Sequence, residues 1–285
     1  MKLSKSFILS IFALLALSIY LFTTAPPPLK DNDDESHTVP VQIALQILEE
    51  ENDIARNLYT KSIVGAGKKQ KIKFDEDWEE EEIIAGPLPA QFMRLTAISL
   101  EHSPLQLGLF LGSDYAINKA NDFEGEQRAN FQKVKETRKP VFFYSQDSER
   151  YAYMAPDIAS VKPCVTCHND HEESPKTDWK LNDVMGAATW TYPKENIGYK
   201  ELLDMIAVLR GSFKHAYQTF LEEISTSKNP PIIGEKWPKD GKFVPSIEIF
   251  MDELVAKSSD ATLKTLLLTT LNDKESSAIK AINES

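Results

Sequence analysis

The stretch PVFFYSQDSERYAYM, residues 140–154, decides the class of fold. Aromatic residues gather at its two ends, PVFFY and YAYM, and the polar residues 146–149 separate them. Two such segments joined by a short polar turn predict a β-hairpin. A further strand is predicted at VMGAATWTY, residues 184–192, which Pro193 ends.

Outward from the hairpin, apolar spacing predicts elements in a mixed order. Helices are expected at residues 41–60, from the region of Pro87 and Pro89, at 123–138, around 202–221, from Ser246 and from Ala261, with a strand at 105–111 and a solvated loop at 65–82. The strands follow one another too closely for parallel crossovers throughout, so an antiparallel sheet is favoured. The predicted fold class is α+β, an antiparallel sheet flanked by helices.

The first 25 residues have the layout of an export signal. Lys2 and Lys5 precede an uninterrupted apolar run at residues 7–22. Three prolines from Pro26 disfavour cleavage after Ala25, so an uncleaved anchor in the inner membrane is favoured over secretion to the periplasm with a removed signal peptide. In both cases the positive end stays inside, and the rest of the chain is expected to be periplasmic.

These patterns divide the chain into four segments. They are a signal sequence or membrane anchor at 1–25, a proline-rich and acidic linker at 26–39, the main α+β domain at 40–197 and a helical extension at 198–285. The formal net charge is −11, and no basic stripe offsets it. This charge argues against nucleic acid as a partner, and the N-terminal segment makes the membrane an expected one.

The two cysteines of the chain lie in one motif, Cys164-Val165-Thr166-Cys167-His168. Two thiols on one helical turn can each add to a vinyl group of the same porphyrin, and the imidazole that follows then lies over the iron. The motif predicts one covalent haem c, held by Cys164 and Cys167 and ligated by His168. Three alternatives remain: a disulfide, which would close a very short loop; a zinc site completed by His171, whose ligands would be unusually close in sequence; and a thioredoxin-like pair, without βαβ surroundings.

The stretch PCVTCHNDHEESPKTDWKLNDVMGA, residues 163–187, resembles the haem-c, PAS-like domain that occurs outside the membrane in some bacterial sensor kinases and nucleotide cyclases and as a free-standing protein. The tract SPKTDWK followed by DVMG is the specific part, and SDYAINKAN at residues 113–121 is also similar. The resemblance covers roughly residues 87–192 and implies a PAS-like twisted antiparallel sheet with helices around it. In signalling relatives a membrane helix and an output domain follow, and neither pattern occurs beyond Tyr199.

The second axial ligand decides between carrying electrons and sensing a ligand. Some members of the family use a cysteine from the N-terminal helix, which cannot apply here because the motif uses both cysteines. The remaining candidates are methionine thioethers and histidine imidazoles. The methionines, which also suit core packing, are Met93, Met154 and Met185. Among the histidines, His102 is more typical of a helix end, His171 is too close to His168 to reach the opposite haem face, and His37 and His215 are weaker candidates. Near the motif, Lys176 and Lys180 are candidates to neutralise haem propionates, and Trp179 is a candidate to pack against the porphyrin edge.

The sequence favours a redox or small-ligand sensor that binds haem c, with a diatomic gas or a redox protein as its partner. The alternative is a periplasmic monohaem electron-transfer cytochrome. An enzyme such as a peroxidase is not expected, because no distal acid–base pair for peroxide cleavage is recognisable.

Overall fold

The computed structural model describes residues 13–18, 20, 38–80, 83–235 and 243–283. Its largest sheet has four antiparallel strands in the order β4 (Gly108–Gly112), β7 (Val184–Tyr192), β6 (Arg150–Ile158) and β5 (Val141–Ser145). The predicted hairpin is confirmed, because β5 pairs with β6 through registers such as Phe143 with Ala152. The predicted strand at 184–192 is β7 itself. The chain therefore has a mixed α/β fold with an antiparallel sheet.

Strand β7 is buried along almost its whole length, which explains its continuous run of apolar and small residues. At Gly186 the neighbouring strand approaches very closely. A Cβ atom added there would lie 2.5 Å from the carbonyl oxygen of Gly112 in β4. The glycine is needed for this close approach, and it fixes how β4 lies against β7 next to the motif segment.

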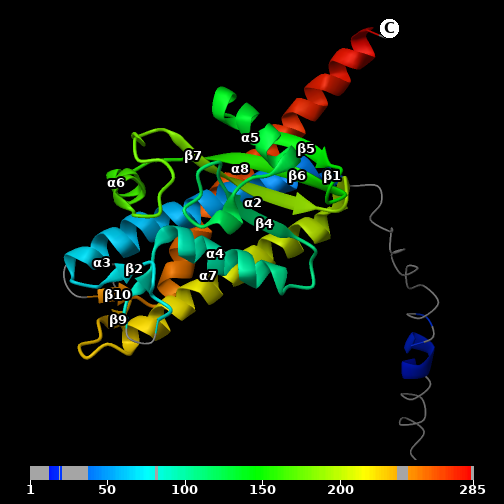
Figure 1. Ribbon diagram of the computed structural model, residues 1–285. Coiled ribbons are helices and arrows are strands. Elements are labelled where there is room, and N and C mark those ends of the chain that lie inside the picture. The colour runs from blue at the N-terminus through cyan, green and yellow to red at the C-terminus, as the bar shows by residue number, and fades with distance from the viewer. Residues whose placement is uncertain (1–12, 19, 21–37, 81–82, 236–242, 284–285) are drawn as a thin grey trace, which may run out of the picture. The chain divides into compact units, whose positions relative to one another are not determined.

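One face of the sheet packs on helices α2 (Val41–Leu58), α4 (Pro89–Glu101) and α7 (Tyr199–Ser225), as Figure 1 shows. The indole of Trp190 in β7 is fully buried there and donates to Glu49 Oε2 of α2 over 2.5 Å. The other face carries α5 (Gly125–Thr137), whose Phe131 and Val134 enclose Met154 in a second, smaller core. The sheet is thus covered on both faces.

Helix α2 continues without a break beyond its predicted end. A π-helical turn, η2 (Tyr59–Val64), leads into α3 (Gly65–Lys69), and a parallel pair of two-residue strands follows, β2 (Phe74–Asp75) with β3 (Gly86–Pro87). The prediction of a loop at 65–82 was therefore wrong for its first part. Two glycines suggested a loop, but Gly67 packs so closely on Phe74 that an added Cβ would lie 2.8 Å from that ring.

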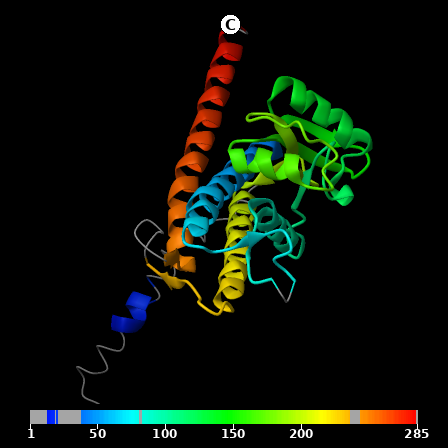
Figure 2. The ribbon, with the colours of Figure 1, turned by 60° about the vertical axis from the view of Figure 1, so that its left-hand side comes forward.

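The C-terminal helices share the core of the main domain. Tyr217 of α7 stacks on Phe250 of α8 (Ile247–Asn283), with ring centroids 3.9 Å apart, and both are fully buried. Helix α8 is one helix, although two helices were predicted from Ser246 and Ala261. No proline or glycine interrupts residues 246–283, so nothing in the sequence forces a break. Figure 2 shows α8 extending beyond the sheet. Between α7 and α8, β9 (Ile232–Gly234) pairs in parallel with β10 (Phe243–Pro245).

The chain divides into two units, residues 1–38 and 39–285. In the first unit, residues 13–18 and 20 are helical. The rest of the predicted signal or anchor segment, and residues 26–37 of the predicted linker, lie outside the described residues. The linker was predicted to reach residue 39, but β1 (Thr38–Pro40) pairs with β8 (Asn196–Gly198), so its end is a strand. Among the residues described, no helix has both the length and the apolar character to span a membrane.

Candidate functional site

The Cys-x-x-Cys-His motif lies on a short helix, α6 (Lys162–Asp170), between strands β6 and β7. Pro163 is in the first turn, where its fixed φ suits a helix and its missing N–H is not needed. Cys164 and His168 are four positions apart and Cys167 lies between them, so one turn brings the two thiols and the imidazole together. The backbone thus supplies the arrangement that the motif predicted.

Both cysteines are free thiols, with Cys164 half-buried and Cys167 exposed. Partial burial of the Cys167 sulfur raises its pKa above the usual value, and the nearby Glu76 carboxylate raises it further. Cys167 is therefore a neutral thiol at neutral pH, unlike the activated thiolate of a thioredoxin-type pair. Within the described part of the chain, no three Cys, His, Asp or Glu side chains are arranged to hold a metal ion.

One ring nitrogen of His168 makes no hydrogen bond within the described structure. This nitrogen is Nδ1, and it is enclosed. Burial lowers the pKa of His168, and the charges of His171 and Arg56 lower it further, while Asp157 opposes the shift. The ring is consequently neutral near pH 7, which is the form that binds iron.

An apolar cluster lies against the motif helix. Trp179, Met185 and Ala159 are buried together, and the half-buried Cys164 and Val165 pack against them. The side chain of Asn169 in α6 pairs with the backbone of Trp179 in both directions, with Trp179 N to Oδ1 at 2.8 Å and Nδ2 to Trp179 O at 3.0 Å. This pairing fixes the loop that follows α6 onto the helix. The Nε1 atom of Trp179 is enclosed without a partner within the described structure, so it is free to donate to a bound group.

The three predicted methionines lie in three different places. Met185 belongs to the cluster that contacts Cys164, whereas Met154 is fully buried under α5 and Met93 is buried in the main core. The structure therefore brings only one of the three, Met185, next to the motif.

Cationic groups surround the motif, some of them far away in sequence. Arg56 of α2 forms an ion pair with Asp157 at 2.6 Å, and its positive charge also interacts with Cys164. Lys176 lies over the Trp179 ring, 4.8 Å from its centroid, and pairs with Asp178. Each of these two cations already pairs with a carboxylate of the chain.

Two other residues, Lys180 and His171, make contacts that hold the loop after the motif helix. Two residues near the motif were not found by sequence analysis. Lys180 is exposed, and its backbone N–H donates to Asp183 at 2.8 Å. His171 pairs with Glu76, with Nε2 and Oε2 3.0 Å apart. Arg56 and Glu76 were not recognised from the sequence, because only the tertiary fold brings α2 and the segment after α3 beside α6.

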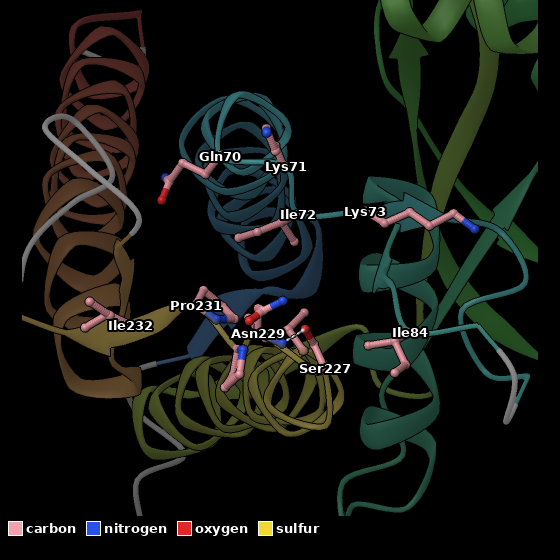
Figure 3. A pocket seen from close by; sticks show the side chains of 11 residues that line it. Gln70, Lys71, Ile72, Lys73, Ile84, Ser227, Asn229, Pro231 and Ile232 are labelled. Atoms are coloured by element: carbon pink, nitrogen blue, oxygen red, sulfur yellow. Dashed lines mark hydrogen bonds between the residues drawn. The ribbon is translucent and has the colours of Figure 1, made fainter.

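A separate cavity of about 740 Å³ opens between the turn after α3 and the segment after α7 (Figure 3). Lys71 and Ile72 line one side, and Asn229 and Pro231 line the other. It contains none of the motif residues.

The fold and the site define a class: a mixed α/β domain that presents a Cys-x-x-Cys-His helix between two central strands of an antiparallel sheet. The family model described as Tll0287-like matches residues 115–193, which run from Tyr115 through α6 to the end of β7. This match covers less than half of the chain and indicates a haem-binding, cytochrome-like domain. No curated protein and no solved structure gives a significant match.

Proposed function

We propose that the chain binds one haem c through thioether bonds from Cys164 and Cys167, with His168 as axial ligand, and acts in redox or small-ligand sensing. The observation that carries the proposal is the set of two free thiols and a neutral, uncommitted imidazole on one turn of α6. The family match over residues 115–193 supports haem binding independently of this geometry. The export pattern at residues 1–25 supports a periplasmic location.

The surroundings of α6 fit a porphyrin. Trp179 and Met185 offer an apolar surface beside Cys164 that would exclude water from one side of the group. Arg56 and Lys176 would neutralise its carboxylates. Once bound, haem supplies an iron that cycles between two oxidation states and, where its sixth position is open, takes a diatomic gas.

We assign the antiparallel sheet with its covering helices to the PAS-like class, and this assignment supports the sensor. The motif helix follows β6 closely and is connected to β7 by the loop at residues 171–183, and those strands carry Met154 and Trp190 into the two cores. A change in the ligation or oxidation state of the iron would therefore be transmitted to β6 and β7, the two central strands of the sheet. The proposal includes no catalytic turnover.

An electron-transfer cytochrome is the second candidate, and the position of Met185 favours it. Its thioether lies in the cluster that contacts Cys164. A thioether that fills the sixth position would keep the iron six-coordinate and would raise its reduction potential.

The test is maturation of the full chain together with a cytochrome c assembly system. Wild-type protein should keep a haem absorbance band on a denaturing gel, and Cys164→Ser with Cys167→Ser should lose it. A wild-type chain that carries no covalent haem would overturn the proposal.

Carbon monoxide separates the two candidates in the reduced holoprotein. An open or displaceable sixth position gives a shifted spectrum, whereas a filled one gives no change. Met185→Leu should open the site if Met185 is the ligand. Met154→Leu is the matched control, because that methionine is buried in another cluster.

A further inference from the structure

Four exposed lysines gather next to the motif helix, on a chain whose net charge is −11. They lie on α3 and the turn after it, and we call them the lysine patch: Lys68, Lys69, Lys71 and Lys73. Glu76, which follows the patch in the chain, contacts His171 at the end of α6, with Nε2 and Oε2 3.0 Å apart. This contact places the patch beside the motif helix, and the charge of Lys68 interacts with the thiol of Cys167.

Hydrogen bonds hold the patch in one conformation. Backbone N–H groups of Gln70 and Ile72 donate to the carbonyl of Gly67 at 2.8 and 3.0 Å, and Lys71 N donates to Lys68 O at 3.1 Å. Lys71 has a φ of 67°, which bends the chain so that the turn closes. Ile72 packs on the main core. Because the backbone is fixed, only the lysine side chains have to become ordered when a partner binds.

The charge of the patch is only partly neutralised by its neighbours. Lys73 pairs with Asp75 at 2.9 Å, and within the described structure the other three lysines form no ion pair. Asp77, Glu79 and Glu80 follow in the chain and are exposed, and Glu76 pairs with His171. Three lysines without an ion pair in the described structure, Lys68, Lys69 and Lys71, thus lie beside an acidic segment of the chain.

The cavity of Figure 3 adjoins the patch and adds an apolar component. Lys71 and Ile72 form one of its walls, and Ile84 and Ile232, which are 40% and 59% exposed, also line it. An apolar centre with a polar, solvent-accessible rim is the usual anatomy of a protein interface.

We propose that the lysine patch docks an acidic redox protein, which exchanges one electron with the haem held by α6. This inference rests on the proposed function. In the exchange, the iron loses or gains one electron, the partner's centre gains or loses it, and no bond or proton moves. Charge attraction would orient the partner at the edge of the molecule where Cys167 lies, despite the overall negative charge.

The first experiment measures docking without relying on the iron. Fluorescein-labelled decaglutamate is titrated with holoprotein at low ionic strength, and binding is followed by anisotropy. The triple variant K68E/K69E/K71E should bind about tenfold more weakly than wild type. The control K139E/K200E/K264E has the same net charge but alters exposed lysines outside the patch, and it should bind much as wild type does. Equal losses in both triples would overturn the proposal.

The second experiment measures the rate of electron transfer. Oxidation of the reduced holoprotein by ferricyanide, an anion, is followed by stopped flow as salt is raised. Attraction by the patch predicts a rate that falls with salt, whereas the net charge alone predicts a rate that rises. The neutral triple K68Q/K69Q/K71Q should reverse the trend, and it serves if the glutamate variant folds poorly.

The outcomes separate the two proposals. If the wild-type chain carries no covalent haem, the proposed function is refuted. If it carries haem but the patch triple variant and the control triple variant bind decaglutamate equally, only the docking surface is refuted. Patch-dependent binding to phosphatidylglycerol vesicles without binding to decaglutamate would identify a membrane-facing surface instead and overturn the protein partner.

Discussion

Glu51 joins the helices of the main domain to the C-terminal helices through a buried ion pair. Its side chain is 0% exposed and receives two hydrogen bonds from Arg210 of α7, Nε to Oε2 at 2.8 Å and Nη2 to Oε1 at 2.6 Å. Thr262 of α8 donates to the same carboxylate at 2.9 Å. Glu51→Ala would remove the acceptor for α7 and α8 at once.

The loss of stability in Glu51→Ala depends on the charge of Arg210, which the substitution leaves without its partner. Removing one partner of a buried pair costs about 3–5 kcal/mol, because the other charge stays buried and uncompensated. Arg210 is 22% exposed and also donates to Ser258, so part of its charge is still solvated. We therefore expect the lower end, about 3 kcal/mol, which is roughly 6–12 °C in Tm for a domain of this size.

Urea denaturation followed by circular dichroism measures this loss, and the expected transition is single because one core includes α2, α7 and α8. Glu51→Met with Arg210→Met should recover most of the stability, since neither charge is then unpaired. Glu253→Ala, which breaks the exposed pair with Lys257, should cost no more than about 0.5 kcal/mol. A loss below about 1 kcal/mol for Glu51→Ala, or a double variant as unstable as the single one, would refute this reasoning.

Two further predictions concern the sheet. Burial raises the pKa of Glu49 well above its usual value, so the folded state holds this proton more tightly than the unfolded one and stability falls as pH rises from the unfolded pKa toward the folded one. Glu49→Gln keeps an acceptor for Trp190 and should flatten that fall in denaturation curves recorded as pH rises above the usual titration range of a glutamate; an unchanged slope would contradict the assignment. Gly186→Ala should cost about 1–3 kcal/mol through its clash with Gly112 O, whereas Gly211→Ala, with open space in α7, should stabilise by about 1 kcal/mol. Melting temperatures of the two alanine variants that move in the same direction would contradict the packing argument.

The sheet and the motif could be predicted because their signals are local. The aromatic segments of the hairpin and the run at 184–192 are each complete within a few residues, and the structure has strands at both places. The Cys-x-x-Cys-His pattern likewise needs only one helical turn, which α6 supplies.

The other parts depend on contacts that the sequence does not show. Gly65 and Gly67 suggested a loop, yet packing on Phe74 stabilises α3. Nothing in the sequence marks Arg56 as a neighbour of the motif, because Asp157 and Cys164 come close to it only when β6 packs on α2. Tertiary packing, rather than local preference, decided these cases.

The motif segment leaves and rejoins the sheet at a single narrow point. Ala159 N donates to Asp183 O at 2.9 Å, and Asn182 N donates to Ala159 O at 3.0 Å, so the excursion between β6 and β7 closes at its base like a long hairpin loop. Loops with closed bases tolerate exchange, since their length adds little to the entropy of folding. The segment between these residues is thus a module that could be grafted onto another hairpin, or replaced by a two-residue turn to leave the sheet without the Cys-x-x-Cys-His helix.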